Sequence, residues 1–125
     1  MDLIQLRSIP DIETLPEFDL LYSVIVFQHN PPPVIARLMD VLFSKVRNGG
    51  YVLFQVPTYC SGYSFIWKEY LSDARQEMEM HVLPQRDVFR LFRNHGIAAI
   101  EIQEDGLTGS DLFLSNTFFG RRDEG

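Results

Sequence analysis

The segment from Phe18 to Phe27 is the feature that most limits what this chain can fold into. It is almost continuously apolar, and it lacks the alternation of polar and apolar residues that a strand with one solvated face would show. Such a run is typical of a strand buried on both faces of a parallel sheet. Because parallel strands need a crossover connection, usually a helix, the segment predicts an α/β fold.

The residues after this strand predict a loop and then an amphipathic helix. Gln28-His29-Asn30 lead into Pro31-Pro32-Pro33, where the prolines disfavour helix before them and preset φ for a helix that begins near Pro33. From Val34 to Val46, apolar residues recur at three-to-four spacing. Asn48-Gly49-Gly50 is expected to end this helix, since glycine tolerates the left-handed conformation of a C-cap.

A second apolar strand completes a βαβ unit. It covers Tyr51 to Val56 and is expected to end at Pro57. Strand, helix and strand in this order predict a right-handed crossover between parallel strands.

The rest of the chain predicts a helix and a hairpin. The helix follows Leu83-Pro84 and ends at Asn94-His95-Gly96. Strands are expected from Ile97 to Gln103 and from Leu112 to Phe119. The loop between them is short enough for antiparallel pairing without a crossover helix. Within Thr58 to Glu79, which carries few structural signals, Ile66 to Leu71 is a candidate short helix.

Length and composition indicate one domain over residues 1–125. With 125 residues, 46% of them hydrophobic, the chain can bury a single core. A net charge of −6 and a pI near 4.9 oppose a nucleic-acid partner, because phosphate binding needs a basic surface.

One cysteine, Cys60, allows no intramolecular disulfide, and no apolar run approaches the roughly 20 residues of a membrane span. The N-terminal residues lack the apolar core of a signal peptide, so we expect a soluble cytoplasmic protein.

The order of these segments resembles the second half of a class I S-adenosylmethionine-dependent methyltransferase domain. The resemblance starts near Leu15 and is carried by FDLLYSVIVFQH, NGGYVLFQVP, LPQRDVFRLFRNHG, IAAIEIQEDGLTG and SNTFFGRR. It implies a partial Rossmann-like sheet of the family's fourth to seventh strands, in the order fourth, fifth, seventh, sixth. It also implies flanking helices in three layers and a final antiparallel hairpin.

The same resemblance implies S-adenosylmethionine as cofactor and a small-molecule hydroxyl or amine as methyl acceptor. The family's first half supplies a Gly-x-Gly turn and an acidic residue for the ribose hydroxyls, and no such glycine turn follows an apolar strand near this N-terminus. We therefore expect neither tight cofactor binding nor methyl transfer by this chain alone.

Three residues resemble the family's cofactor-lining positions at the end of its fourth strand: Tyr22, Ser23 and Val24. Tyr22 and Val24 are equally well explained as core residues. Ser23 is the better binding candidate, because ligands of open α/β sheets bind outside the carboxyl ends of strands.

Candidates for acceptor chemistry lie in the loops after the strands. His29 has a side chain suited to general base catalysis on an acceptor hydroxyl, although a histidine that orients the next helix fits as well. Pro57-Thr58-Tyr59 fits an acceptor contact or a simple turn. The aromatic residues Phe65, Trp67 and Tyr70 suit either a lid or ordinary packing.

The sequence predicts no metal site. His81 has no second histidine at helical spacing. His95, beside Gly96, is better explained as a cation at a helix C-terminus.

Without a neighbour on its other side, the strand Phe18 to Phe27 would be an exposed apolar edge, which natural proteins avoid. We expect that edge to pair in a homodimer or with a missing N-terminal half. Three hypotheses follow: an excised half of a methyltransferase, a non-catalytic module that binds a partner through residues 18–27, and an unrelated α/β domain with the same order of elements.

Overall fold

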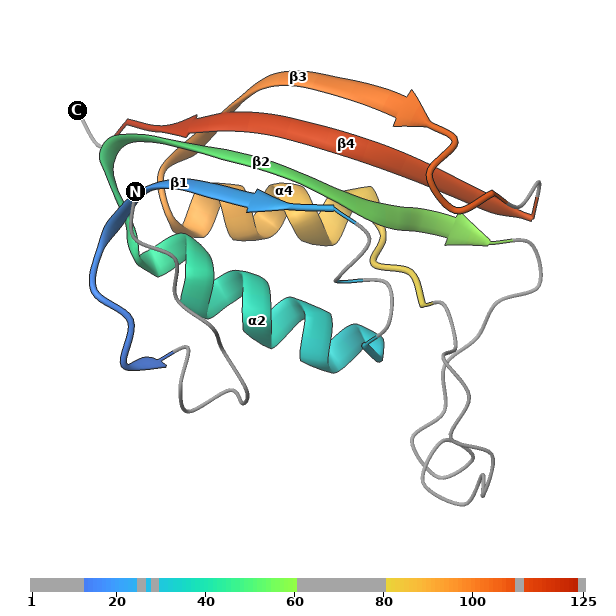
Figure 1. The fold of residues 1–125 in the computed structure, drawn as a ribbon, viewed down its shortest axis with the longest axis horizontal. Helices are drawn as coiled ribbons and strands as arrows, with labels where there is room; N and C mark the ends of the chain where they lie inside the picture. Colours follow the sequence, from blue (N-terminus) through green and yellow to red (C-terminus); the bar gives the residue numbers. More distant parts are fainter. Residues whose placement is uncertain (1–12, 25–26, 28–29, 61–80, 110–111, 124–125) are drawn as a thin grey trace.

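The computed structural model describes residues 13–24, 27, 30–60, 81–109 and 112–123. They form four strands and two helices (Figure 1). In chain order these are β1 (Phe18–Ser23), α2 (Pro32–Ser44), β2 (Val46–Cys60), α4 (Gln85–Asn94), β3 (Ile97–Asp105) and β4 (Phe113–Arg122). Within this part of the chain, no helix is long and apolar enough to cross a membrane.

The four strands form one mixed sheet in the order β1-β2-β4-β3. Strands β1 and β2 run parallel, whereas β4 pairs antiparallel with both β2 and β3. The predicted strand order, parallel pair and C-terminal hairpin are all confirmed. The predicted βαβ unit, from β1 through α2 to β2, is present as well. A second crossover, through α4, joins β2 to β3, which runs in the same direction as β2.

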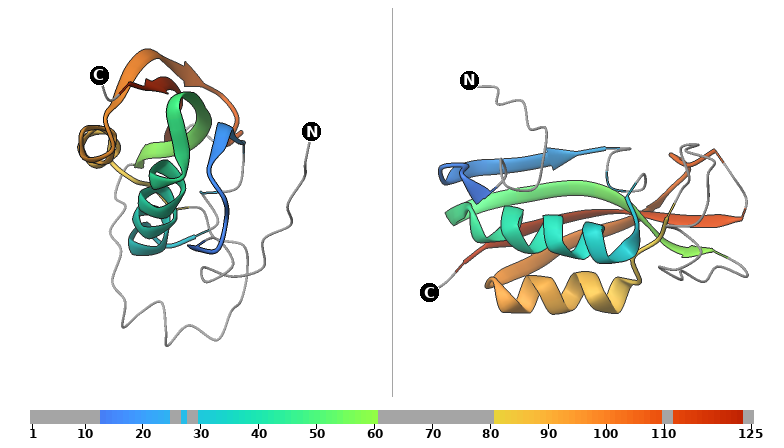
Figure 2. Two further views of the ribbon diagram at one scale, coloured as in Figure 1. Left: turned by 90° about the vertical axis from the view of Figure 1, so that its left-hand side faces the viewer. Right: turned by 90° about the horizontal axis from the view of Figure 1, so that it is seen from below.

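Both helices cover the same face of the sheet (Figures 1 and 2). The expectation of three layers is therefore wrong for the described residues, which form two layers. The crossovers from β1 to β2 and from β2 to β3 move across the sheet in the same direction. Two right-handed crossovers in one direction place their helices on one face.

The core lies between the helices and this face. Four phenylalanines from four elements meet there: Phe43 of α2, Phe54 of β2, Phe92 of α4 and Phe118 of β4. Ring centroids lie 5.5 Å apart between Phe43 and Phe54, and 5.3 Å apart between Phe54 and Phe118. Since all four are almost completely buried, this cluster holds both helices to the sheet.

The glycine pair after α2 has a different role from the one expected. Helix α2 ends at Ser44, and β2 begins at Val46, before the glycines. Phe18 pairs with Val46 but Leu20 pairs with Tyr51, so residues 47–50 form a bulge opposite Asp19. Gly49 has a φ of 86° within this bulge, where it shapes the strand and does not cap the helix.

Arg122, at the end of β4, supplies partners for the C-terminal carbonyls of α2. Its Nη1 lies 3.1 Å from the carbonyl oxygens of Phe43 and Ser44 and 2.9 Å from that of Val46. The last carbonyls of a helix have no intrahelical partner, and the helix dipole favours a cation there. This contact joins residues almost 80 positions apart, and the sequence contained no local signal for it.

Replacing Arg122 with alanine is expected to lower the free energy of unfolding by about 2 kcal/mol, because carbonyls bonded to a charged donor lose it. Urea denaturation followed by circular dichroism measures the change. Arg121→Ala is the matched control: Arg121 is exposed, lies over the ring of Tyr51 at 5.9 Å, and should cost less than about 1 kcal/mol. Equal losses in the two variants would contradict the capping role.

Several predicted boundaries shift in the structure. Strand β2 continues through Pro57 to Cys60, with a register shift between Pro57 and Tyr59 that accommodates the missing proline N–H. Strand β1 stops at Ser23, and Phe27 packs edge-on against Phe54 at 5.9 Å. The loop between the last two strands is shorter than expected, because β3 extends to Asp105.

Helix α4 agrees with its prediction at both ends. Pro84 precedes it as N-cap, and Gly96 follows with a φ of 65°. The candidate helix Ile66 to Leu71 lies outside the described residues.

Candidate functional site

The candidate site lies at the carboxyl end of the parallel strands. Ser23 ends β1 opposite Phe54, and β2 continues beyond that level to Cys60. Ligands of open α/β sheets bind outside this end of the strands. Tyr22, Ser23 and Val24, the positions suggested by resemblance, are therefore at the end of the sheet where a ligand is expected.

These three residues do not share one face. Leu21 is buried in the core beneath the helices, and Ser23 lies on the same side of β1 two residues later. Tyr22 points to the face that neither α2 nor α4 covers and is 64% exposed, so its interpretation as a core residue is wrong. Val24 follows the strand and is half-buried.

Ser23 is the side chain at this end with unmet hydrogen-bonding capacity. Its hydroxyl oxygen is buried and has no hydrogen-bond partner among the residues that the structure describes. Leaving a buried hydroxyl without a partner costs about 1–3 kcal/mol, and buried polar groups in native structures are rarely left so. The hydroxyl is thus ready to donate to, or accept from, a ligand at the strand end.

A polar cluster lies further along, at the end of β2. The Thr58 hydroxyl donates to Asn116 Oδ1 at 2.6 Å, and Gln85 Nε2 donates to the same oxygen at 3.0 Å. These residues come from β2, β4 and the first turn of α4. Because each of these contacts satisfies a polar group, the cluster fixes the three elements relative to one another.

A second buried pair joins β2 and β4. Gln55 Nε2 donates to Ser115 Oγ at 2.7 Å, and both side chains are fully buried. Sequence reasoning singled out Thr58 in this region but missed Asn116, Gln85, Gln55 and Ser115. No local pattern marks them, since they come together only when β4 pairs with β2.

Of the histidines considered, His95 and His81 can be placed. His95 Nε2 lies 2.7 Å from Asp40 Oδ1, so it links the end of α4 to α2 besides standing at a helix C-terminus. His81 is buried. Among the described residues, no cluster of three His, Cys, Asp or Glu side chains is placed to hold a metal. His29, Phe65, Trp67 and Tyr70 lie outside the described residues.

The described residues supply only part of a site for S-adenosylmethionine. Ser23 offers one buried hydroxyl at the strand end. The glycines with positive φ in the described ranges are Gly49, Gly96 and Gly109, and none of them follows the carboxyl end of β1. Without a backbone turn that can approach a ligand closely at that end, these residues do not form a complete cofactor cradle.

No protein-family model and no curated protein matches the sequence. Solved structures of S-adenosylmethionine-dependent methyltransferases do match the fold. Magnesium protoporphyrin IX methyltransferase from Synechocystis, solved with bound S-adenosylhomocysteine, has a TM-score of 0.62 at 12% identity. A methyltransferase from Methanosarcina mazei has a TM-score of 0.62 at 15% identity, and TehB from Haemophilus influenzae one of 0.63 at 12%.

The matches cover nearly all of this chain but only part of each neighbour. They span 90%, 90% and 95% of this chain, and 48%, 64% and 40% of the Synechocystis, Methanosarcina and Haemophilus proteins. The chain therefore has the fold of part of an S-adenosylmethionine-dependent methyltransferase domain.

Proposed function

We propose that this chain is the carboxyl-terminal half of a methyltransferase domain, and that another stretch of polypeptide completes its cofactor site. The observation that carries this proposal is the match itself, which spans 90% of this chain and 48% of the Synechocystis enzyme. By itself, the chain is expected to transfer no methyl group. The additional half supplies the glycine-rich turn, and Ser23 contributes a hydrogen bond from the end of β1.

The free edge of the sheet supports this proposal. Among the described residues, β1 pairs only with β2, so its other edge carries unpaired backbone groups. Long unpaired edges are normally covered, because they template pairing with other chains. A strand of the missing half placed beside β1 would satisfy those groups and bring the glycine-rich turn next to Ser23.

The reaction class comes from the fold match, and the acceptor class is an extension of it. The Synechocystis neighbour is named for a small organic acceptor, magnesium protoporphyrin IX. We propose a small-molecule hydroxyl or amine as acceptor here as well, with the cytoplasm as the compartment. Methyl transfer by direct displacement depends mainly on proximity and alignment, which suits a site of hydroxyl and amide groups.

Calorimetric titration with S-adenosylmethionine tests the proposal. The purified 125-residue chain is expected to show no binding at micromolar concentration. A longer polypeptide that includes a glycine-rich half should bind, and Ser23→Ala in that polypeptide should weaken binding by about fivefold, equivalent to one hydrogen bond. Thr117→Ala, on the other side of the sheet, is the matched control and should change affinity little. Micromolar binding or turnover by the short chain alone would contradict the proposal.

A second candidate function is a non-catalytic module that associates through β1. The observation that favours it is the exposure of large apolar side chains on the face without helices: Leu20 is 56% and Tyr22 64% exposed. Tyr51 and Phe119 stack beside them with ring centroids 5.6 Å apart. Apolar patches of this kind mark interaction surfaces, and two copies paired through β1 would form an isologous dimer.

Light scattering separates the two candidates. A mass of twice 14.5 kDa, together with no cofactor binding, would favour the self-associating module. Leu20→Lys should then return the protein to a monomer, because the charge would be buried between copies. Ile100→Lys, at the equally exposed Ile100 of the other edge strand, is the control. A monomeric wild type would exclude the dimer.

A further inference from the structure

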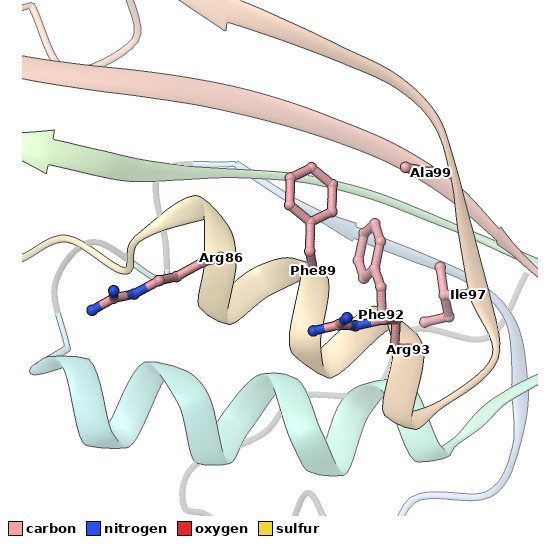
Figure 3. A pocket seen from close by; sticks show the side chains of 6 residues that line it. All are labelled: Arg86, Phe89, Phe92, Arg93, Ile97 and Ala99. Carbon is pink, nitrogen blue, oxygen red and sulfur yellow. The ribbon is translucent and has the colours of Figure 1, made fainter.

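A groove lies between α4 and β3 (Figure 3), and β3 is the edge of the sheet opposite to β1. Its volume is about 450 Å³, and it is open to solvent. Phe89, Phe92, Ile97 and Ala99 form its apolar floor, and Arg86 and Arg93 form its rim. The groove belongs to neither the β1 edge nor the carboxyl end of the parallel strands, so it is independent of the proposed function.

Strand β3 contributes a small side chain, that of Ala99, to the lining of the groove. Ala99 faces α4 at a position where a larger residue would fill the space against Phe89 (Figure 3). Strand β3 is also an edge of the sheet, and among the described residues it pairs only with β4. An apolar groove therefore runs beside a strand whose outer backbone groups have no partner strand.

The two rim arginines distinguish this groove from an ordinary surface depression. Arg90, on the same helix, is paired with Asp87 at 2.6 Å. Arg86 and Arg93 form no ion pair with any described residue. They lie seven residues apart, which is about two helical turns and about 10.5 Å, and they extend the same way from α4 (Figure 3). In a chain with a net charge of −6, two unpaired cations beside an apolar floor need an explanation.

We propose that this groove binds an extended acidic segment of a partner protein, which adds a strand to the free edge of β3. In an extended segment, residues i, i+2 and i+4 point to one face and span about 13 Å. This span is within a few ångströms of the rise of about 10.5 Å between Arg86 and Arg93 along α4, a difference that long arginine side chains can bridge. The sequence pattern Glu-x-Val-x-Glu therefore fits, with valine on the apolar floor and each glutamate paired with Arg86 or Arg93.

Strand addition and pairing with the arginines would each contribute to the affinity of the acidic segment for the groove. Main-chain hydrogen bonds to an edge strand give affinity for any extended chain. The arginines add charge-assisted hydrogen bonds that select carboxylates. A nucleic acid fits less well, because the acidic protein as a whole would repel a polyphosphate.

Fluorescence anisotropy with two labelled peptides tests the proposal on the full chain. The probe is Thr-Glu-Thr-Val-Thr-Glu-Thr, and the control peptide has lysine in place of both glutamates. The acidic probe should bind at least about tenfold more tightly than the lysine peptide, and its affinity should fall as salt is raised. No binding of the acidic probe, or equal binding of both peptides, would overturn the proposal.

Variants of the groove identify the site. Arg86→Glu combined with Arg93→Glu should weaken probe binding at least about tenfold. Arg47→Glu introduces a charge reversal beside β1, at the opposite edge of the sheet, and should leave binding within about twofold. Ala99→Leu fills the groove and should also weaken binding, while circular dichroism checks that the fold is kept. Equal weakening by Arg47→Glu and by the double variant would show general electrostatic attraction and overturn the assignment.

Discussion

Phe54→Ala is expected to lower the free energy of unfolding by about 4 kcal/mol, since removing a fully buried aromatic ring costs about 3–5 kcal/mol. Phe54 is fully buried and contacts rings from both helices, from β4 and from Phe27. Its loss leaves a cavity at a point where all these elements meet. Because a domain is stable by only about 5–15 kcal/mol in total, the variant should be close to unfolding at 25 °C.

Phe119→Ala is the matched control for this prediction. Phe119 lies on the neighbouring strand, on the face without helices, where it stacks on Tyr51. It is partly exposed, so its truncation should cost only about 1 kcal/mol. Urea denaturation followed by circular dichroism measures both. If Phe54→Ala does not fold, Phe54→Leu, with an expected loss of about 1.5 kcal/mol, keeps the comparison measurable. Equal losses at the two positions would contradict the assignment of the core to the helix-covered face.

Gly50→Ala is expected to destabilise the protein by about 2–3 kcal/mol, because added atoms in a packed site force backbone shifts. A Cβ at this position would lie 2.8 Å from the carbonyl oxygen of Asp19, 2.9 Å from that of Arg47 and 2.9 Å from Val46 Cγ1. Two of these neighbours are backbone atoms that cannot rotate away. The substitution should therefore disturb the bulge that aligns β1 with β2.

Gly106→Ala is the control for this second prediction. Nothing lies within 4 Å of a Cβ built at Gly106, so the change should stay within about 0.5 kcal/mol. Thermal unfolding of the two variants under the same conditions gives the comparison. A Gly50→Ala protein as stable as Gly106→Ala would mean that the strands can separate at this point without cost.

The two proposals place different partners on opposite edges of one sheet. The β1 edge and Ser23 concern the completion of a methyltransferase site, whereas the groove between α4 and β3 concerns a separate acidic segment. Since the edges are separated by β2 and β4, variants at one edge should not change binding at the other. Loss of cofactor binding and loss of peptide binding are therefore separable results.

The sequence by itself determined the types of the elements and their order. Periodicity and apolar runs identify helices and strands, because they reflect which faces must be buried. The βαβ pattern and the resemblance together predicted the order β1-β2-β4-β3 and the parallel and antiparallel pairs. Boundaries were less certain, since a proline or glycine pair can sit inside a bulged strand, as Pro57 and Gly49-Gly50 do.

Only the tertiary structure decided which face of the sheet is covered, and with it the environment of the candidate site. The sequence of Tyr22 and Ser23 does not show that one is exposed and the other is buried without a partner, because that depends on where both helices pack. Nor does it show that Arg122 caps α2 or that Ala99 leaves a groove beside Arg86 and Arg93. These contacts join residues distant in the chain, and local pattern carries no information about a partner that is brought near only by the completed fold.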